Sequence, residues 1–98
     1  MKLNEEYYIM TACGLMKCYG KKLDDNFAIV YNWKDNSYSL THTKSGLCAY
    51  KRNTLKDCDN NIEADKKAML HWIQTHQKEN ERNINQFNYL LEYKIFNN

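Results

Sequence analysis

The sequence predicts an α+β fold in which a three-stranded antiparallel β-meander follows one helix and precedes two more, in the order α-β-β-β-α-α. Three observations lead to this fold class. Runs rich in β-branched and aromatic residues, separated by short polar turns, occupy 27–51, and apolar residues recur at helical spacing before and after them. The chain has 98 residues, the size of a single small domain spanning 1–98. Because three strands cannot bury both faces of a sheet, we expect the helices on one face.

The first element, over 5–19, is predicted to be a helix. Asn4 is a suitable N-cap, and Glu5 and Glu6 would face the positive end of the helix dipole. Apolar side chains then follow at helical spacing, at Tyr8, Ile9, Ala12, Cys13, Met16 and Tyr19. Gly14 costs such a helix about 1 kcal/mol relative to alanine. A β-hairpin that turns near Gly14 is therefore the alternative for this segment.

Three strands are predicted over 27–33, 37–43 and 47–51. The first is rich in β-branched and aromatic residues, and the second alternates apolar with polar side chains. Short polar turns separate them, and Gly46 in the second turn can adopt a positive φ. The sequence leaves open whether the helices cover the sheet face that carries Phe27 or the opposite face.

Two helices are predicted after the sheet. Thr54 and Asp57 resemble a capping box, although two asparagines favour a true start near residue 62. A polar stretch over 77–83 indicates a break, and a last helix is predicted over 83–95. The apolar stripe of this last helix consists of Ile84, Phe87, Leu91 and Ile95.

The composition argues against most chemistries. A net charge of +2 provides no strongly basic tail, and no apolar run approaches the ~20 residues of a membrane-spanning helix. The four cysteines lack the spacing of structural zinc sites, and the three glycines form no phosphate-binding loop. We therefore expect a protein with no metal, no cofactor and no enzymatic activity. If the protein is an enzyme after all, the alternative hypothesis is a cysteine-dependent one.

The N-terminal residues bear on the state of the cysteines. Lys2 is followed by Asn4, Glu5 and Glu6, which is not the charged-then-apolar order of a secretory signal. We therefore expect a cytoplasmic protein with four reduced thiols rather than two disulfides.

Candidate binding residues lie in a turn and in a basic stretch. His42 ends a predicted strand beside the second turn, where it is either a pH-sensitive recognition residue or a hydrogen-bonded anchor of the hairpin, and we favour the anchor. No acidic residue lies between Lys44 and Lys56, and Tyr50 lies among the cations. Alternating cations and aromatic rings can follow a phosphate backbone. The full candidate set is His42, Lys44, Tyr50, Lys51, Arg52, Lys56, Lys66 and Lys67.

Two resemblances extend this interpretation. The predicted order α-β-β-β-α resembles that of double-stranded RNA-binding domains, and Asp65-Lys66-Lys67-Ala68 resembles the basic helix start with which that family meets phosphates. That resemblance implies nucleic-acid binding through Lys66 and Lys67. In size and in its Asn-, Lys- and Tyr-rich composition, the chain also resembles accessory proteins of phages and mobile elements, many of which, including anti-CRISPR proteins, inhibit a host defence enzyme.

The leading hypothesis is a non-enzymatic binding protein with a macromolecular partner, most simply another protein. Its contact surface would combine the second turn, the basic stretch and any exposed sheet aromatics, with lysines steering it toward an acidic partner. The alternative is a nucleic-acid-binding module. A third hypothesis is that an exposed patch is the interface of a homodimer. No membrane partner is expected.

Overall fold

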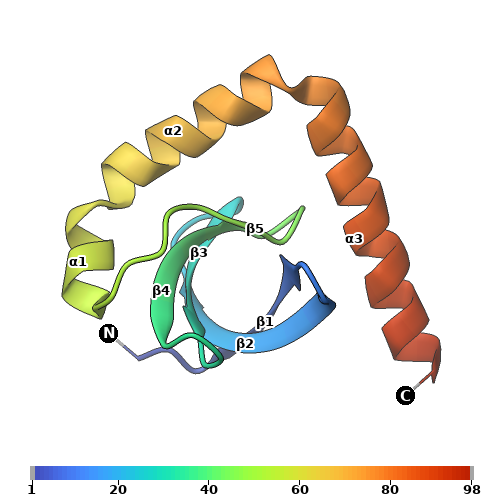
Figure 1. The fold of residues 1–98 in the computed structure, drawn as a ribbon, viewed down its shortest axis with the longest axis horizontal. Helices are drawn as coiled ribbons and strands as arrows, with labels where there is room; N and C mark the ends of the chain where they lie inside the picture. Colours follow the sequence, from blue (N-terminus) through green and yellow to red (C-terminus); the bar gives the residue numbers. More distant parts are fainter. Residues whose placement is uncertain (1, 98) are drawn as a thin grey trace.

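Five strands and then three helices make up the computed structural model of this chain, which describes residues 2–97 and the side chains of residues 2–94. Figure 1 shows the strands grouped in one curled sheet, with the helices passing around its outside. The strands are β1 (Glu5–Thr11), β2 (Gly14–Lys22), β3 (Phe27–Asn32), β4 (Ser37–His42) and β5 (Leu47–Cys48). The helices are α1 (Leu55–Asn60), α2 (Ile62–Thr75) and α3 (Gln77–Asn97).

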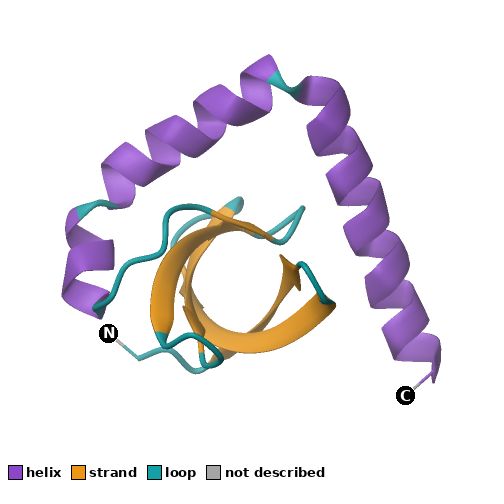
Figure 2. Cartoon of the chain, in the orientation of Figure 1, coloured by secondary structure: helices purple, strands orange, loops and turns teal. Residues whose placement is uncertain are grey.

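The sheet is antiparallel, and its strand order is β1-β2-β3-β4-β5, so that strands adjacent in the sequence pair with each other. It curls into a half-barrel (Figure 2). The curl brings the end of β1 close to the turn between β4 and β5, where the backbone N–H of Met10 donates to the carbonyl oxygen of Gly46 at 2.9 Å. The first strand of the sheet is thereby tied to its last turn.

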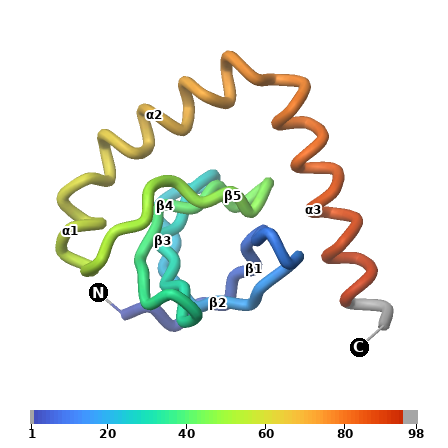
Figure 3. Tube along the Cα trace, in the orientation of Figure 1, coloured from blue at the N-terminus to red at the C-terminus, as the bar shows by residue number. Residues whose placement is uncertain are grey.

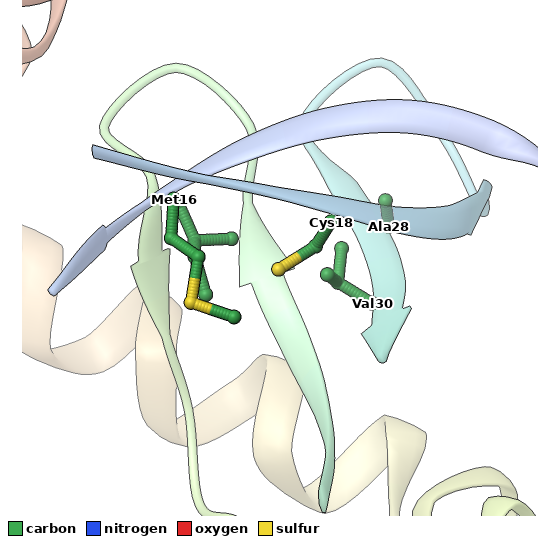
Figure 4. Packing of buried hydrophobic residues seen from close by; sticks show 5 residues of the cluster. Met16, Cys18, Ala28 and Val30 are labelled. Carbon is green, nitrogen blue, oxygen red and sulfur yellow. The ribbon is translucent and has the colours of Figure 1, made fainter. Parts of the chain in front are cut away.

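The concave face of the half-barrel holds one part of the hydrophobic core. Five buried residues pack together there, as Figure 4 shows for the labelled ones: Ile9, Met16, Cys18, Ala28 and Val30. β4 adds the small buried side chains of Ser37, Ser39 and Thr41 to the same face. Small side chains suit this position, because the side chains of a curled sheet converge on its concave side.

The convex face, called the outer face below, packs against helices. Phe27 and Leu40 lie on it, and both are buried against Met69 of α2. Farther around the sheet lies α3 (Figure 3), whose buried Phe87 ring lies directly over Gly46. The sheet therefore separates two apolar layers, one inside the half-barrel and one beneath the helices.

The predicted N-terminal helix over 5–19 is wrong, and so is the predicted three-stranded meander. Those residues form the β1–β2 hairpin, the alternative interpretation, and the sheet has five strands. Gly14 opens β2 with a φ of +108°, a left-handed conformation that glycine adopts readily and other residues do not. The apolar residues that fit a helical period also fit strand alternation, which places Ile9 and Met16 together inside the half-barrel.

The region after the sheet also differs from its prediction, because it forms three helices instead of two. Thr54 is the N-cap of α1, as predicted, and its hydroxyl accepts a hydrogen bond from the N–H of Asp57 at 3.0 Å. The predicted third strand shortens to β5, and the predicted break over 77–83 is wrong, since only His76 separates α2 from α3. The side chain of Ile95, part of the predicted stripe, lies outside the described residues.

Candidate binding surface

A row of tyrosines crosses the outer face of the sheet. In the strand register, Tyr19 of β2 faces Tyr31 of β3, and Tyr31 faces Tyr38 of β4. We call these three residues the tyrosine row. The rings of Tyr31 and Tyr38 lie 5.0 Å apart between centroids and are tilted by 47°, a favourable aromatic geometry. Cross-strand register therefore builds this row from residues that are far apart in the sequence.

Charged residues end the row on both sides. Glu6 of β1 faces Tyr19, and an isolated β-bridge pairs Arg52 with Tyr38. The carboxylate of Glu6 pairs with Lys17 at 2.9 Å, so this end of the row carries no excess charge. The row thus crosses β2, β3 and β4, and its flanking residues lie on the edge strand β1 and in the segment that follows β5.

Trp33 lies beside the tyrosine row, just after β3. Its indole N–H donates to the carbonyl oxygen of Lys17 at 2.9 Å, which holds the ring next to β2. The hydroxyl of Tyr31 donates to the side chain of Asn36 in the following turn. Both hydrogen bonds restrict the rotation of these rings, so the surface they form is preorganised, which lowers the entropic cost of binding.

The helices leave this part of the outer face open. They bury Phe27 and Leu40 at one end of β3 and β4, whereas at the other end Tyr31 and Tyr38 are only half-buried. The exposed fractions of Tyr19 and Trp33 are 45% and 57%. The sequence leaves open which face the helices cover, and the structure shows that they cover one part of the Phe27 face and expose the aromatic remainder.

Arg52 joins the tyrosine row to α2. Its guanidinium group makes two hydrogen bonds to Asp65, whose side chain is only 3% exposed, at 2.7 and 3.3 Å. The same guanidinium lies 5.7 Å from the ring centroid of Tyr50, a side chain with an exposed fraction of 63%. The outer aromatic surface, as we define it, consists of Tyr19, Tyr31, Trp33, Tyr38 and Tyr50.

A groove of about 400 Å³ adjoins this surface between β5 and α2. Tyr50 belongs to both the groove and the outer aromatic surface, and Asp65 lines the groove beside its ion pair with Arg52. Its lining is mostly apolar and comprises Leu47, Cys48, Ala49, Tyr50, Asp65, Ala68, Met69 and Trp72. An apolar side chain of a bound partner would find contact area there.

The structure does not bring the predicted basic residues together as one free positive patch. Lys51 pairs with Asp35 at 2.5 Å, and Lys66 pairs with Asp24 at 2.7 Å. Hydrogen bonding from Lys51, and then from Ser37, holds the pKa of Asp35 below its usual value, so this carboxylate is ionised and neutralises its lysine. Arg52 is neutralised by Asp65 in the same way.

Three predicted lysines remain exposed at separate places. Lys44 lies in the turn after β4, Lys56 in α1 and Lys67 in α2. None of the three forms an ion pair with a residue between 2 and 97. Unpaired cations in different elements favour long-range steering toward a negative surface more than a defined contact.

His42 is an anchor of the β4–β5 turn. Its Nδ1 atom lies 2.7 Å from the Ser45 hydroxyl, and its ring packs 5.7 Å from that of Phe27. Burial, and then the nearby charge of Lys44, lowers the pKa of His42 below its usual value, so the imidazole is neutral at pH 7. With only 6% of its surface exposed, His42 offers little to a partner and serves the turn instead.

Three of the four cysteines are poorly suited to act as nucleophiles. Burial raises the pKa of Cys18 and of Cys58 to about 11 and also raises the pKa of Cys48, so these thiols are protonated at neutral pH. All four cysteines are free, and Cys13 is exposed. Within residues 2–97, no group of three or more His, Cys, Asp or Glu side chains could hold a metal ion.

Comparisons with family models, with curated proteins and with solved structures found no match to this chain. In the part of the chain that the structure describes, no helix is long and apolar enough to cross a membrane. Among residues 2–97, the predicted order α-β-β-β-α, on which the resemblance to double-stranded RNA-binding domains depends, does not occur, because the strands precede every helix there.

Sequence reasoning included any exposed sheet aromatics in the contact surface but left open which face carries them, and it did not foresee the contribution of Tyr19. The candidate binding residues include only Tyr50 from the outer aromatic surface, and the helix predicted over 5–19 contains Tyr19. The available signal is the alternation within 14–22, where Met16 and Cys18 point inward and Lys17 and Tyr19 point outward. That pattern becomes informative only once the segment is known to be a strand.

Proposed function

We propose that this chain is a non-catalytic binding protein that binds a protein partner through its outer aromatic surface. The observation that carries the proposal is the tyrosine row, an ordered run of aromatic side chains that the helices leave uncovered. Tyrosine and tryptophan are enriched at protein interfaces, where they contribute large contact areas at little entropic cost. Monomeric proteins seldom expose contiguous apolar patches unless the patch has a role.

Charge favours a protein over a nucleic acid as the partner. A nucleic-acid site needs cations that are free to meet phosphates, but Lys51, Arg52 and Lys66 already pair with carboxylates of this chain. The unpaired Lys44, Lys56 and Lys67 would steer a partner with an acidic surface. The resemblance to phage and mobile-element accessory proteins suggests an inhibitor that covers the surface of a host defence enzyme.

Affinity capture from the native host tests this proposal. The tagged wild-type chain should retain one protein at a fixed stoichiometry, and Trp33→Ser should weaken that interaction by about 30-fold, the effect of losing a residue that dominates an interface. Tyr89→Ser is the matched control, because Tyr89 is exposed to 67% and belongs to α3 rather than to the tyrosine row. This control should bind like the wild type.

Two outcomes would contradict the proposal. Equal binding by the Trp33→Ser and wild-type proteins would show that the partner uses another surface. Binding of a generic duplex, with an affinity that falls steeply and linearly in log salt, would establish the nucleic-acid alternative instead.

A further inference from the structure

A small cavity lies on the concave face of the half-barrel, between the end of β1, the end of β3 and the start of β4. Its volume is about 200 Å³, and it is distinct from the groove between β5 and α2. Ile9 and Val30, which belong to the buried core of the concave face, form its apolar side. Ser37 and Ser39 line it from β4. We call this space the inner cavity.

Ser39 brings a hydroxyl without a protein partner to the inner cavity. The residue is only 5% exposed. Both neighbouring hydroxyls on the same face of β4 are occupied, since Ser37 donates to Asp35 at 2.5 Å and Thr41 lies 3.3 Å from the sulfur of Cys48. Among the residues that the structure describes, none forms a hydrogen bond with the Ser39 hydroxyl. Buried hydroxyls are rarely left unbonded, so Ser39 is suited to meet a group from outside the chain.

The inner cavity presents no unpaired charge. Lys51 is the one charged side chain among the described residues that line it, and its ammonium group pairs with Asp35 at 2.5 Å. Cys48 also lines the cavity, and its thiol is protonated because burial raises its pKa. A charged ligand would lose its hydration there without gaining a free counter-ion. The lining therefore favours a neutral ligand.

The volume of the inner cavity sets the size of the ligand. An apolar cavity of about 150 Å³ holds one benzene ring, so a cavity of about 200 Å³ has room for a ring with one small substituent. Water alone suits this space poorly, because a buried water molecule needs about two to four polar partners and the side chains of Ile9 and Val30 offer none. Displacement of poorly held water by an apolar group increases affinity.

We propose that the inner cavity binds a small neutral molecule of the phenol type, a single ring that carries one hydroxyl group. The ring packs against Ile9 and Val30, and its hydroxyl forms a hydrogen bond with Ser39. The openings of β-barrels are common places for small-molecule sites of this mixed character. The inner cavity lies on the concave face and the outer aromatic surface on the convex face, so this binding is separate from the capture of a protein partner.

Heteronuclear NMR titration of the full chain with phenol tests the proposal. We expect saturable shifts of the amide signals, centred on Ile9, Val30 and Ser39. The dissociation constant should be about 1 mM or tighter, an affinity that a ligand of this size can reach. Benzoate, a ring of similar size with a negative charge, should bind at least about 10-fold more weakly, because the cavity holds no unpaired cation.

Ser39→Ala tests the hydrogen bond to the ligand. This variant should bind phenol about 5-fold more weakly and should bind toluene, which lacks the hydroxyl, as the wild type does. It should fold, because the Ser39 hydroxyl has no hydrogen bond within the described chain to lose. Thr41→Val is the matched control, since Thr41 is buried on the same face of β4 but does not line the inner cavity. The control should bind phenol like the wild type.

Three results would overturn the proposal. The first is the absence of saturable shifts up to about 10 mM phenol, a concentration that detects even weak binding. The second is a set of shifts centred on Ala68 and Trp72, which would place phenol in the groove between β5 and α2. The third is equal phenol affinity of the Ser39→Ala and wild-type proteins. Partner capture through Trp33 would stand after any of them, so this proposal and the proposed function can fail separately.

Discussion

Replacing Arg52 with methionine should lower the free energy of unfolding clearly more than substitution of an exposed lysine on α2 does, because it removes the cation that pairs with the buried carboxylate of Asp65. Arg52 gives two hydrogen bonds to Asp65, and the Asp65 side chain is only 3% exposed. Methionine keeps much of the apolar stem of arginine, so the variant isolates the loss of charge. The remaining carboxylate would be buried without a cation, which is more costly than losing a neutral hydrogen bond.

Chemical denaturation at pH 7 measures this effect. Lys67→Met is the matched control, because Lys67 is exposed on the same helix, and it should change stability by less than about 0.5 kcal/mol. Adding Asp65→Asn to the Arg52→Met variant should recover part of the loss, since the buried charge is then absent. A loss in Arg52→Met no larger than that in Lys67→Met would show that the ion pair does not hold α2 to the sheet.

Gly46→Ala should destabilise the chain by about 2–4 kcal/mol, through backbone strain and overpacking together. Gly46 has a φ of +71°, and a Cβ atom there would lie 2.5 Å from Cε1 of Phe87 and 3.0 Å from the nitrogen of Met10. The buried Phe87 ring would have to move. The hydrogen bond from Met10 to Gly46 would be disturbed as well, so the substitution acts where α3, β1 and the β4–β5 turn meet.

Gly14→Ala separates the effect of backbone strain from the effect of overpacking. Gly14 also has a positive φ, +108°, but a Cβ atom there would have no described atom within 4 Å beyond its chain neighbours, so this variant carries backbone strain without a clash. Thermal unfolding should show a smaller loss for Gly14→Ala than for Gly46→Ala. Phe87→Leu combined with Gly46→Ala should cost less than the sum of the two single changes, because a smaller side chain relieves the contact. Equal losses at both glycines would argue against tight packing of α3.

The central part of the fold could be predicted from local patterns. β3 and β4 lie within one residue of their predicted ends, because their β-branched and aromatic residues are bounded by polar turns. Gly46 adopts the positive φ expected of its turn, and Thr54 caps its helix. The segment 5–19 could not be assigned, because its apolar residues satisfy both a helical and an alternating period. Only pairing with β3, which is a tertiary contact, decides between the two.

The candidate site depended even more on tertiary contacts. The lysines that looked free in the sequence are neutralised by acids far along the chain: Asp35 pairs with Lys51, and Asp24 pairs with Lys66. The tyrosine row joins residues of β2, β3 and β4 that become neighbours only through strand register. The anchoring role of His42 could be predicted from the sequence. Its hydrogen-bond partner Ser45 is only three residues away along the chain, so no tertiary contact is needed to bring the two together.

Hydroxyl-radical footprinting of the captured complex tests the central claim most directly, since it reports the solvent exposure of individual aromatic side chains. We expect Tyr19, Trp33 and Tyr50, which are exposed in the free chain, to lose reactivity when the partner binds. Tyr89 on α3 should react equally in the free and bound chain and serves as the internal reference. Protection of Tyr89 with unchanged reactivity of Tyr19 and Trp33 would place the binding site on α3 and contradict the account.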